Sequence, residues 1–320
     1  MTIVLGIDGG GTGTQALVAD ETGHVYASAT VGPTNPNAVS RSQLKETITT
    51  LMTELHYDDP TAFNKIARGF AGMSGSGDSE KSHLVETVLA EAAPDFPIRV
   101  DNDAINALYA ETLGEPGIVQ IAGTGSITFG LNETGETARI GGWGYLFGDE
   151  GSGYAIGQSA LEAIFQAYDG KMEADVITRH ILAYAQIQDV PDLIPYIYES
   201  PSPRESIAKL TRPVFQAYDE GDTLAIRLIQ QSADDLTFSV QTMLNRHFKH
   251  NQEVVLAGGV FKRRDVLPTI LNHQLSAPVK MLEREPVVGA VVAALQDAGV
   301  LVQSEFKSSV DKASNNKSAK

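Results

Sequence analysis

The sequence contains no cysteine. This excludes disulfide bonds, iron–sulfur clusters, thiolate-bound metals and a catalytic thiol. It also lacks any apolar run near the roughly 18 residues that a membrane-spanning helix needs. Its first residues carry no basic flank of the kind that precedes the apolar core of a signal peptide. We therefore expect a cytoplasmic protein with no membrane partner.

Basic residues are scarce. The chain has 24 Lys and Arg against 40 Asp and Glu, a formal net charge of −16, and its longest basic cluster is residues 262–264. A surface of this charge repels nucleic acid, so no nucleic-acid partner is expected. A nucleotide ligand remains compatible with the charge, because phosphates can be bound by backbone N–H groups and a metal ion.

The length and composition indicate two soluble domains. With 320 residues, 42% of them hydrophobic, the chain exceeds the usual size of one domain. We place an N-terminal domain at 1–113 and a C-terminal domain at 114–302, with the option that the last helix packs back on the N-terminal domain. Residues 303–320 are rich in Ser, Lys and Asn and are predicted to be disordered.

Short apolar runs and glycine-rich turns alternate in the first part of the chain, and helical spacing dominates beyond residue 155. Strands are predicted at 3–5, 15–19, 24–29, 67–73, 98–100, 117–122, 127–131 and 253–256. Helices are predicted around 44–55 and 84–89, from 104, at 223–246 and at 288–298.

One stretch of the N-terminus is repeated later in the chain. Gly-Thr-Gly at 11–13 recurs at 123–125, and Glu-Thr-Gly at 21–23 recurs at 133–135. Both matches have the same offset (123 − 11 and 133 − 21 are each 112), so no gap is needed. This predicts a duplicated β-hairpin with a phosphate-sized turn, one copy in each domain.

The first of these turns has the composition of a phosphate cradle. Residues 9–11 are glycines, which let successive N–H groups approach an anion closely, and Thr12 adds a hydroxyl. Gly10, Gly11 and Thr12 are therefore candidate nucleotide ligands, and Asp8 at the strand end could hold Mg²⁺ through water. Glycine-rich hairpins that bind nothing are also common, so the turn alone leaves both interpretations open.

Two further glycine motifs could complete a nucleotide site. Gly123, Thr124 and Gly125 form the repeat partner of the first turn. Residues 257–262 (AGGVFK) follow a buried-type strand, and their glycines could let an adenine or ribose lie against the backbone. In isolation this last motif is more typical of an ordinary strand-to-helix turn. From it we take Gly258, Gly259 and Lys262 as candidates.

These motifs, together with residues 141–152 (GGWGYLFGDEGS), resemble the actin–hexokinase–sugar kinase superfamily. They most resemble the family that contains N-acetylglucosamine kinase and the BadF/BcrA-type ATPases, over about residues 3–298. The resemblance implies an α/β fold of two actin-like (ribonuclease H-like) domains with a nucleotide and sugar cleft between them. It also implies ATP and Mg²⁺ as cofactors, a small amino sugar as substrate and a homodimer.

The resemblance also implies roles for single residues. Thr12 and Thr124 match phosphate-contacting threonines, and Gly258 matches a glycine beside the adenosine. Asp103 matches the catalytic aspartate, with Asp101 as the rival candidate. The positions matched to sugar contacts are Asn35, Gly142, Trp143, Gly144 and Asp149, with Ser126 as a further candidate.

The function that follows is ATP-dependent phosphorylation of an amino sugar, with Asp103 accepting the proton of the attacking hydroxyl. N-acetylglucosamine phosphorylated at its 6-hydroxyl is the first choice. Glucosamine, N-acetylmuramic acid, its 1,6-anhydro form and a non-catalytic sugar sensor are the alternatives. An activator of radical enzymes is excluded by the missing cysteines, and the cysteine–histidine zinc motif usual in kinases of the ROK type is also missing.

Two of the sugar candidates have a purely structural alternative. Trp143, the only tryptophan, could instead be a core aromatic between domains. Asp149 could instead be a turn residue that caps a helix.

Overall fold

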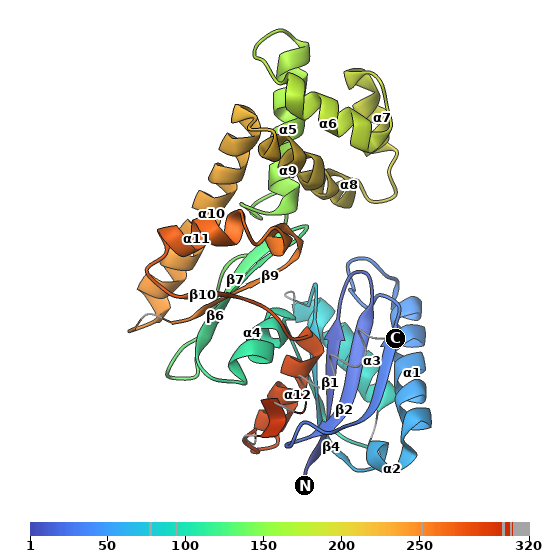
Figure 1. Cartoon of the computed structure of the whole chain (residues 1–320). Helices are drawn as coiled ribbons and strands as arrows, with labels where there is room; N and C mark the ends of the chain where they lie inside the picture. The colour runs from blue at the N-terminus through green and yellow to red at the C-terminus, as the bar shows by residue number, and fades with distance from the viewer. Residues whose placement is uncertain (77–78, 94, 251, 303–304, 308, 310–320) are drawn as a thin grey trace. The chain divides into compact units, whose positions relative to one another are not determined.

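The structure, a computed structural model, describes residues 1–76, 79–93, 95–250, 252–302, 305–307 and 309. It consists of two compact units (Figure 1). Unit 1 comprises Met1–Glu115 and Leu282–Lys320, and unit 2 comprises Pro116–Met281.

Unit 1 is built on a five-stranded sheet with the order β3-β2-β1-β4-β5. Its strands are β1 (Ile3–Gly9), β2 (Thr14–Asp20), β3 (Val25–Val31), β4 (Ile66–Met73) and β5 (Ile98–Asp101). The first three strands are antiparallel, whereas β4 and β5 run parallel to β1. The helices are α1 (Arg41–Asp58), α2 (Pro60–Phe63), α3 (Ser79–Ala92), α4 (Ala104–Thr112) and α12 (Pro286–Asp297). Buried side chains of the strands, α1 and α3 form one apolar core.

Helix α12 joins unit 1 although it lies near the end of the chain. It buries every residue from Val287 to Leu295 and packs against α4 and β1. The approach to β1 is close, because a Cβ on Gly6 would lie 2.5 Å from the backbone nitrogen of Val291. The sequence assigns residues 282–302 to the second domain, with the option that the last helix packs on the first domain. In the structure these residues are part of unit 1.

The chain end departs in part from the predicted disorder. Residues 305–307 are helical, and Phe306 is 1% exposed because its ring packs inside the protein. The remaining residues of the predicted tail, apart from residue 309, lie outside the described part of the chain.

Unit 2 repeats the strand order of unit 1. Its sheet has the order β10-β9-β6-β7-β8. Read from the other edge, β8-β7-β6-β9-β10 corresponds strand by strand to β3-β2-β1-β4-β5 of unit 1. The strands are β6 (Gly117–Ala122), β7 (Ser126–Leu131), β8 (Thr137–Gly141), β9 (Val254–Ala257) and β10 (Val279–Met281). The helical elements are α5 (Gly153–Tyr168), α6 (Asp175–Ala185), η1 (Val190–Asp192), α7 (Leu193–Tyr198), α8 (Pro203–Lys209), α9 (Thr211–Asp219), α10 (Thr223–His247), η2 (Gly259–Lys262) and α11 (Leu267–Gln274).

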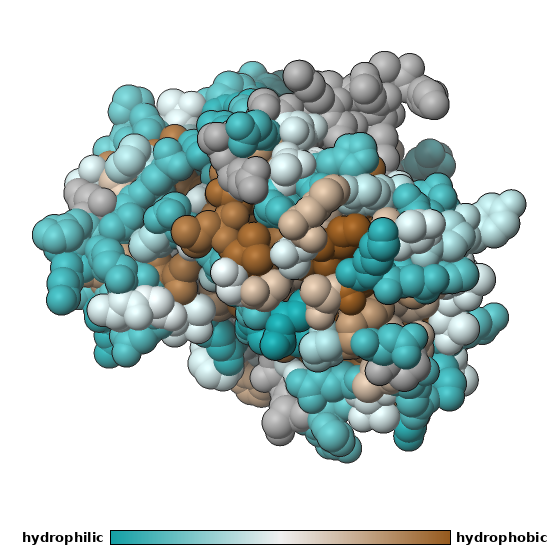
Figure 2. Space-filling view, turned by 90° about the horizontal axis from the view of Figure 1, so that it is seen from below, coloured by the Kyte–Doolittle hydropathy of each residue, from teal (hydrophilic) through white to brown (hydrophobic). Residues whose placement is uncertain are grey.

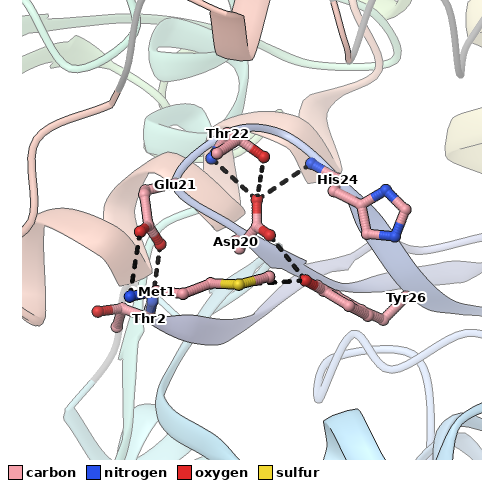
Figure 3. A network of polar contacts seen from close by, with 7 residues as sticks. All are labelled: Met1, Thr2, Asp20, Glu21, Thr22, His24 and Tyr26. Atoms are coloured by element: carbon pink, nitrogen blue, oxygen red, sulfur yellow. Dashed lines mark hydrogen bonds and ion pairs between the residues drawn. The ribbon is translucent and has the colours of Figure 1, made fainter.

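The repeated hairpins share their hydrogen bonds as well as their sequence. In unit 1, Oδ1 of Asp20 accepts bonds from the backbone N–H and hydroxyl of Thr22 and from the N–H of His24 (Figure 3). In unit 2, Oδ1 of Asn132 accepts the same three bonds from the residues two and four positions further on. The Tyr26 hydroxyl adds a bond to the free oxygen of Asp20 in unit 1. The duplication predicted from two short motifs is therefore present in three dimensions.

The glycine turns of the two hairpins differ by one residue. In unit 1, Gly9 pairs with Thr14 across the four residues 10–13. In unit 2, Ala122 pairs with Ser126 across the three residues 123–125. The gap-free alignment therefore holds for the second strand of each hairpin and is wrong by one residue for the first.

Figure 2 shows a face on which hydrophilic residues cover most of the area and hydrophobic residues occupy smaller areas. No helix formed by the described residues has the length and apolarity that a membrane crossing requires.

Candidate active site

Asp8 lies near the end of β1, beside Gly72 of the parallel strand β4. Burial raises the pKa of its carboxyl, and a hydrogen bond from Asn106 partly opposes the shift. The Nδ2 of Asn106 donates to Oδ1 of Asp8 at 2.7 Å and also contacts the carbonyl oxygens of Ile7 (3.3 Å) and Gly72 (3.2 Å). Because these neighbours are all acceptors, the amide orientation is fixed, and Asp8 is held in one position.

Asn106 is a residue of this site that the sequence analysis missed. Its side chain is 0% exposed, and it is the one polar residue among the buried residues 104–110 of α4. That isolated amide in an apolar helix was the available signal, because a buried polar group needs partners. Its Oδ1 has no partner among the described residues.

Replacing Asn106 with Ala should lower the free energy of unfolding by about 2 kcal/mol, because Asp8 and two carbonyls lose a buried donor. Urea unfolding without ligand would measure this. Asn102→Ala is the matched control. It removes one bond, to the Ala104 N–H, at the start of the same helix and should cost about 1 kcal/mol or less. An Asn106 variant as stable as wild type would contradict the proposed support of Asp8.

Asp103 immediately precedes α4. Burial, followed by the charge of Asp8, raises the pKa of Asp103 from its ordinary value of 3.8 to about 6. Hydrogen bonds, including one from the Ser74 hydroxyl and one from the Ala104 N–H, oppose this rise. The rival Asp101 differs, because Arg99 neutralises it through an ion pair of 2.8 Å. The raised pKa therefore favours Asp103 over Asp101 as a group whose proton can be exchanged near neutral pH.

Asn35 reaches the same group of residues. Its Nδ2 donates to the Ser74 hydroxyl at 3.3 Å, and its Oδ1 accepts the N–H of Asn37 at 2.9 Å. The backbone N–H of Ser74 donates to the Gly9 carbonyl at 2.8 Å. Asn35, which the sequence proposed for sugar binding, thus contacts Ser74, another residue that the sequence analysis did not identify.

The first glycine turn is short and open. The N–H of Gly10 donates to the Gly13 carbonyl at 3.0 Å, and the Gly10 carbonyl accepts the N–H of Thr34 at 3.2 Å. Gly11 and Thr12 at the tip are exposed. Both are therefore accessible to an anionic ligand, as a phosphate-binding turn requires.

The second glycine turn is braced by helix α5. The N–H of Gly123 donates to the Gly125 carbonyl at 2.9 Å. The first residues of α5 hold the turn from the other side: the N–H of Gly153 donates to the Gly123 carbonyl at 2.8 Å, and that of Tyr154 to the Thr124 carbonyl at 3.2 Å. A Cβ on Gly123 would meet no atom within 4 Å, so there is open space beside the backbone at that residue, whereas a Cβ on Gly125 would lie 2.7 Å from Oδ2 of Asp149.

Asp149 lies beside the second turn. It is 3% exposed, has a φ of 64°, and accepts the Ser126 N–H at 3.2 Å. Its other oxygen forms an ion pair of 2.8 Å with Arg204, which the sequence analysis missed. The helix-cap interpretation of Asp149 is wrong, because the hydroxyl of Ser152 caps α5.

Trp143 lies on the surface of unit 2 and is 65% exposed. The guanidinium of Arg139 lies 3.8 Å from the centroid of its ring, which is cation–π geometry. The same guanidinium donates to the carbonyls of Gly141 and Gly142 at 3.2 Å each. Arg139 thereby orders the segment that contains Gly142, Trp143 and Gly144.

The third glycine motif follows β9. Gly258 has a φ of 107°, and a Cβ there would lie 2.6 Å from the carbonyl carbon of Ala122 at the end of β6. The next residue is different, because a Cβ on Gly259 would meet nothing within 4 Å. Lys262, which ends η2, is exposed. The structure thus places Gly258 close to the second glycine turn, within unit 2.

The two sheets have the same strand order, β3-β2-β1-β4-β5 in unit 1 and β8-β7-β6-β9-β10 in unit 2, and each contains one copy of the duplicated hairpin with its glycine turn. This arrangement defines an actin-like (ribonuclease H-like) α/β protein. More specifically, the chain belongs to the BadF/BadG/BcrA/BcrD ATPase family, which matches residues 5–295. The predicted fold class and family are both confirmed, and the family implies ATP as the nucleotide.

Several relatives are kinases by name. The chain is 34% identical over 269 residues to N-acetylmuramic acid/N-acetylglucosamine kinase of Clostridium acetobutylicum, which covers 83% of this chain and 88% of the relative. It is 30% identical over 311 residues to N-acetyl-D-glucosamine kinase of Dictyostelium discoideum, with 92% and 98% covered. The solved structure of a candidate N-acetylglucosamine kinase from Chromobacterium violaceum shares the fold, with a TM-score of 0.71 at 24% identity and with 91% and 98% covered.

Proposed function

We propose that this protein transfers the γ-phosphoryl group of ATP to the 6-hydroxyl of N-acetylglucosamine. The observation that carries the proposal is Asp103, a carboxyl directly before α4 whose pKa is raised to about 6 by burial and by the charge of Asp8. The names of the Clostridium and Dictyostelium relatives support an N-acetylated amino sugar as the acceptor.

In this proposal Asp103 is the general base. It accepts the proton of the sugar hydroxyl as that oxygen attacks the γ-phosphorus, and ADP leaves. A carboxyl with a pKa near 6 is largely ionised at neutral pH and is more basic than an ordinary Asp, so it suits this role.

The phosphates would be bound by the two glycine turns with Thr12 and Thr124, and the adenosine would lie beside Gly258, with Gly259 and Lys262 near it. Among the described residues, no group of three or more His, Asp or Glu side chains could hold a metal ion. A single carboxylate, Asp8, fits Mg²⁺, which is usually held by one or two carboxylates, water and the substrate phosphates. When bound, Mg²⁺ would supply neutralisation of the phosphate charge.

The sugar would contact Asn35 in unit 1 and, in unit 2, the segment from Gly142 to Gly144 and the Ser126–Asp149 pair. Asp149 is engaged by Arg204, so a sugar hydroxyl would have to share or replace that ion pair. The family resemblance further supports a homodimer.

A coupled assay of ADP release tests the proposal. Mg²⁺-ATP would be offered with N-acetylglucosamine, glucosamine, N-acetylmuramic acid and its 1,6-anhydro form. We expect turnover with N-acetylglucosamine and, by phosphorus NMR of the product, a 6-phosphate. ADP release that no sugar stimulates would overturn the kinase proposal in favour of a sugar sensor.

N-acetylmuramic acid is the second candidate acceptor. The relative at 34% identity carries this sugar in its name together with N-acetylglucosamine. Equal kcat/KM values for the two sugars would identify a kinase with both activities, whereas a strong preference would decide between them.

The pH dependence of the reaction should report Asp103. Because the base must be ionised, kcat/KM for the sugar should fall as the pH drops through about 6, the raised pKa of this carboxyl. An ordinary Asp would place that fall near pH 4. The measurement is a pH profile of kcat/KM from about pH 5 to 8 under saturating Mg²⁺-ATP. Activity that stays constant down to pH 5 would argue against Asp103 as the base.

A further inference from the structure

We propose that Arg139 is a positioning residue for sugar binding: it holds the indole of Trp143 by one face and leaves the opposite face for the amino sugar. The inference rests on the proposed function, in which the segment from Gly142 to Gly144 contacts the sugar. It adds a residue that neither the sequence motifs nor the comparisons assign to the site.

Three contacts link Arg139 to the end of β8 and to the residues that follow this strand. Its Cζ lies 3.8 Å from the centroid of the Trp143 ring, and its Nη1 donates to the carbonyls of Gly141 and Gly142 at 3.2 Å each. Because a guanidinium is planar and carries several N–H groups, it can stack on a ring and donate to carbonyls at the same time. One side chain thus fixes both the backbone and the ring of this segment.

Arg139 differs from the other arginines that stack on aromatic rings in the described part of the chain. Its Cζ is 3.8 Å from the ring centroid, whereas theirs are 4.5, 5.5 and 5.7 Å away. Each of the others also forms an ion pair with a carboxylate; they are Arg99, Arg204 and Arg263. Arg139 forms no ion pair among the described residues, although acidic residues outnumber basic ones by 40 to 24. Its contacts with the ring and the carbonyls therefore indicate its role.

The ring of Trp143 needs such a contact because packing restrains it little. The residue is 65% exposed, and its neighbours Gly142 and Gly144 have φ angles of 69° and 91°. Glycines on both sides leave the backbone many accessible conformations, and an exposed side chain changes rotamer on the picosecond to nanosecond timescale. Holding the ring in place before the sugar arrives lowers the entropy cost of binding.

The two faces of the indole differ once Arg139 is in place. The guanidinium covers one face, to which the quadrupole of the ring attracts its charge. The other face can pack against the C–H groups of a sugar ring, which buries apolar surface and gains dispersion energy. Such a contact involves no reacting atom and is equally strong in the ground state and the transition state, so it should act on KM and not on kcat.

The first experiment compares Arg139→Ala and Arg139→Lys with wild type in the ADP-release assay with N-acetylglucosamine. Arg139→Ala should raise the KM for the sugar about tenfold, since the ring must then be ordered on binding, while kcat and the KM for ATP stay within about twofold. Arg139→Lys keeps the charge but loses the planar fork, and its KM should lie between the two. A loss that falls on kcat, or an unchanged KM in Arg139→Ala, would overturn the proposal.

Arg227→Ala is the matched control. Arg227 is exposed on α10 in the same unit, so this variant also removes one positive charge from the surface of unit 2. Its KM for the sugar should stay within about twofold of wild type. A rise in KM as large as that of Arg139→Ala would show that net charge, and not the contact with Trp143, sets the affinity for the sugar.

The fluorescence of Trp143 gives a readout that does not depend on catalysis. Trp143 is the only tryptophan in the chain, so the indole emission reports this ring alone. Without sugar, the fluorescence anisotropy should be lower in Arg139→Ala than in wild type or Arg227→Ala, because the ring moves more freely. Adding N-acetylglucosamine should bring the anisotropy of Arg139→Ala toward that of wild type. Equal anisotropy in Arg139→Ala and wild type without sugar would overturn the positioning role.

A double-mutant cycle with Trp143→Ala tests whether Arg139 acts through the ring. If it does, the KM of the double variant should be within about twofold of that of Trp143→Ala alone. Additive increases in KM, in an enzyme that phosphorylates the sugar, would overturn the role of Arg139 and leave the proposed function intact. A wild type whose emission responds to no amino sugar and which phosphorylates none would overturn the proposed function, and the role of Arg139 in sugar binding with it.

Discussion

Asp103→Asn is expected to lower kcat with N-acetylglucosamine by about 10³-fold, the size of effect that removal of a general base commonly has. The amide is nearly isosteric with the carboxyl but cannot accept the hydroxyl proton at neutral pH. The substitution leaves Asn35 and the other proposed sugar contacts in place, so the KM for the sugar should change by less than about fivefold. Initial rates of ADP release over a range of sugar concentrations would measure both parameters.

The same substitution should not destabilise the protein. The pKa of Asp103 is raised from 3.8 to about 6, so the folded state binds its proton more tightly than the unfolded state does. For this group, stability is therefore lost as the pH rises between about 4 and 6, and at pH 7 the full penalty of a buried charge beside Asp8 remains. A neutral Asn removes that penalty, so the Tm at pH 7 should equal or exceed that of wild type.

Asp101→Asn is the control for both measurements. Asp101 lies two residues earlier and carries a carboxylate that is exposed and paired with Arg99. Its substitution should leave kcat within about threefold of wild type. If Asp101→Asn abolished turnover and Asp103→Asn did not, the roles of the two aspartates would have to be exchanged.

The elements with a strong local signal were predictable. The predicted helix 223–246 corresponds to α10 (Thr223–His247), because Asp222 caps it and its buried residues follow a helical period. The predicted strand 3–5 extends in the structure to Gly9. Its second half contains Asp8 and glycines, which have low strand propensity, and is held by pairing with β2 and β4 instead.

The elements and site residues that the sequence did not predict depend on contacts between residues far apart in the chain. Strand β10 has three half-buried residues, and parallel pairing with β9 defines it. Ser74 and Asn106 become important only when the loop after β4 and helix α4 meet the end of β1. A single sequence shows a serine in a turn and an asparagine in a helix, and neither residue reveals its partner.

The two copies of the hairpin differ in the residue beside their glycine turns. The residue before the last one in β1 is Asp8, and the equivalent residue in β6 is Ile121. Unit 1 thus places an acidic group beside its glycine turn, and unit 2 places an apolar side chain there. This asymmetry agrees with the proposal that unit 1 supplies the metal-binding carboxylate and the base, whereas unit 2 supplies a second phosphate turn and the adenosine contact.

Gly258→Ala is expected to be the most damaging substitution in the proposed adenosine site. Gly258 has a φ of 107° and a ψ of 168°, a conformation that is essentially restricted to glycine. A Cβ would in addition press on the backbone of Ala122, 2.6 Å from its carbonyl carbon. Strain and overlap together should lower the free energy of unfolding by about 3 kcal/mol. The Ala122 backbone leads directly into the second glycine turn, so ATP binding should weaken as well.

Gly259→Ala is the matched control for this prediction. It makes the same chemical change one residue later, where a Cβ would meet nothing within 4 Å and the backbone conformation is not restricted to glycine. Its free energy of unfolding should stay within about 0.5 kcal/mol of wild type. Urea unfolding and ATP titration by calorimetry would compare the two variants. Equal losses of stability and of ATP binding in the two variants would show that the Gly-Gly pair matters for its flexibility. The close approach of Gly258 to the Ala122 backbone would then not explain why residue 258 is a glycine.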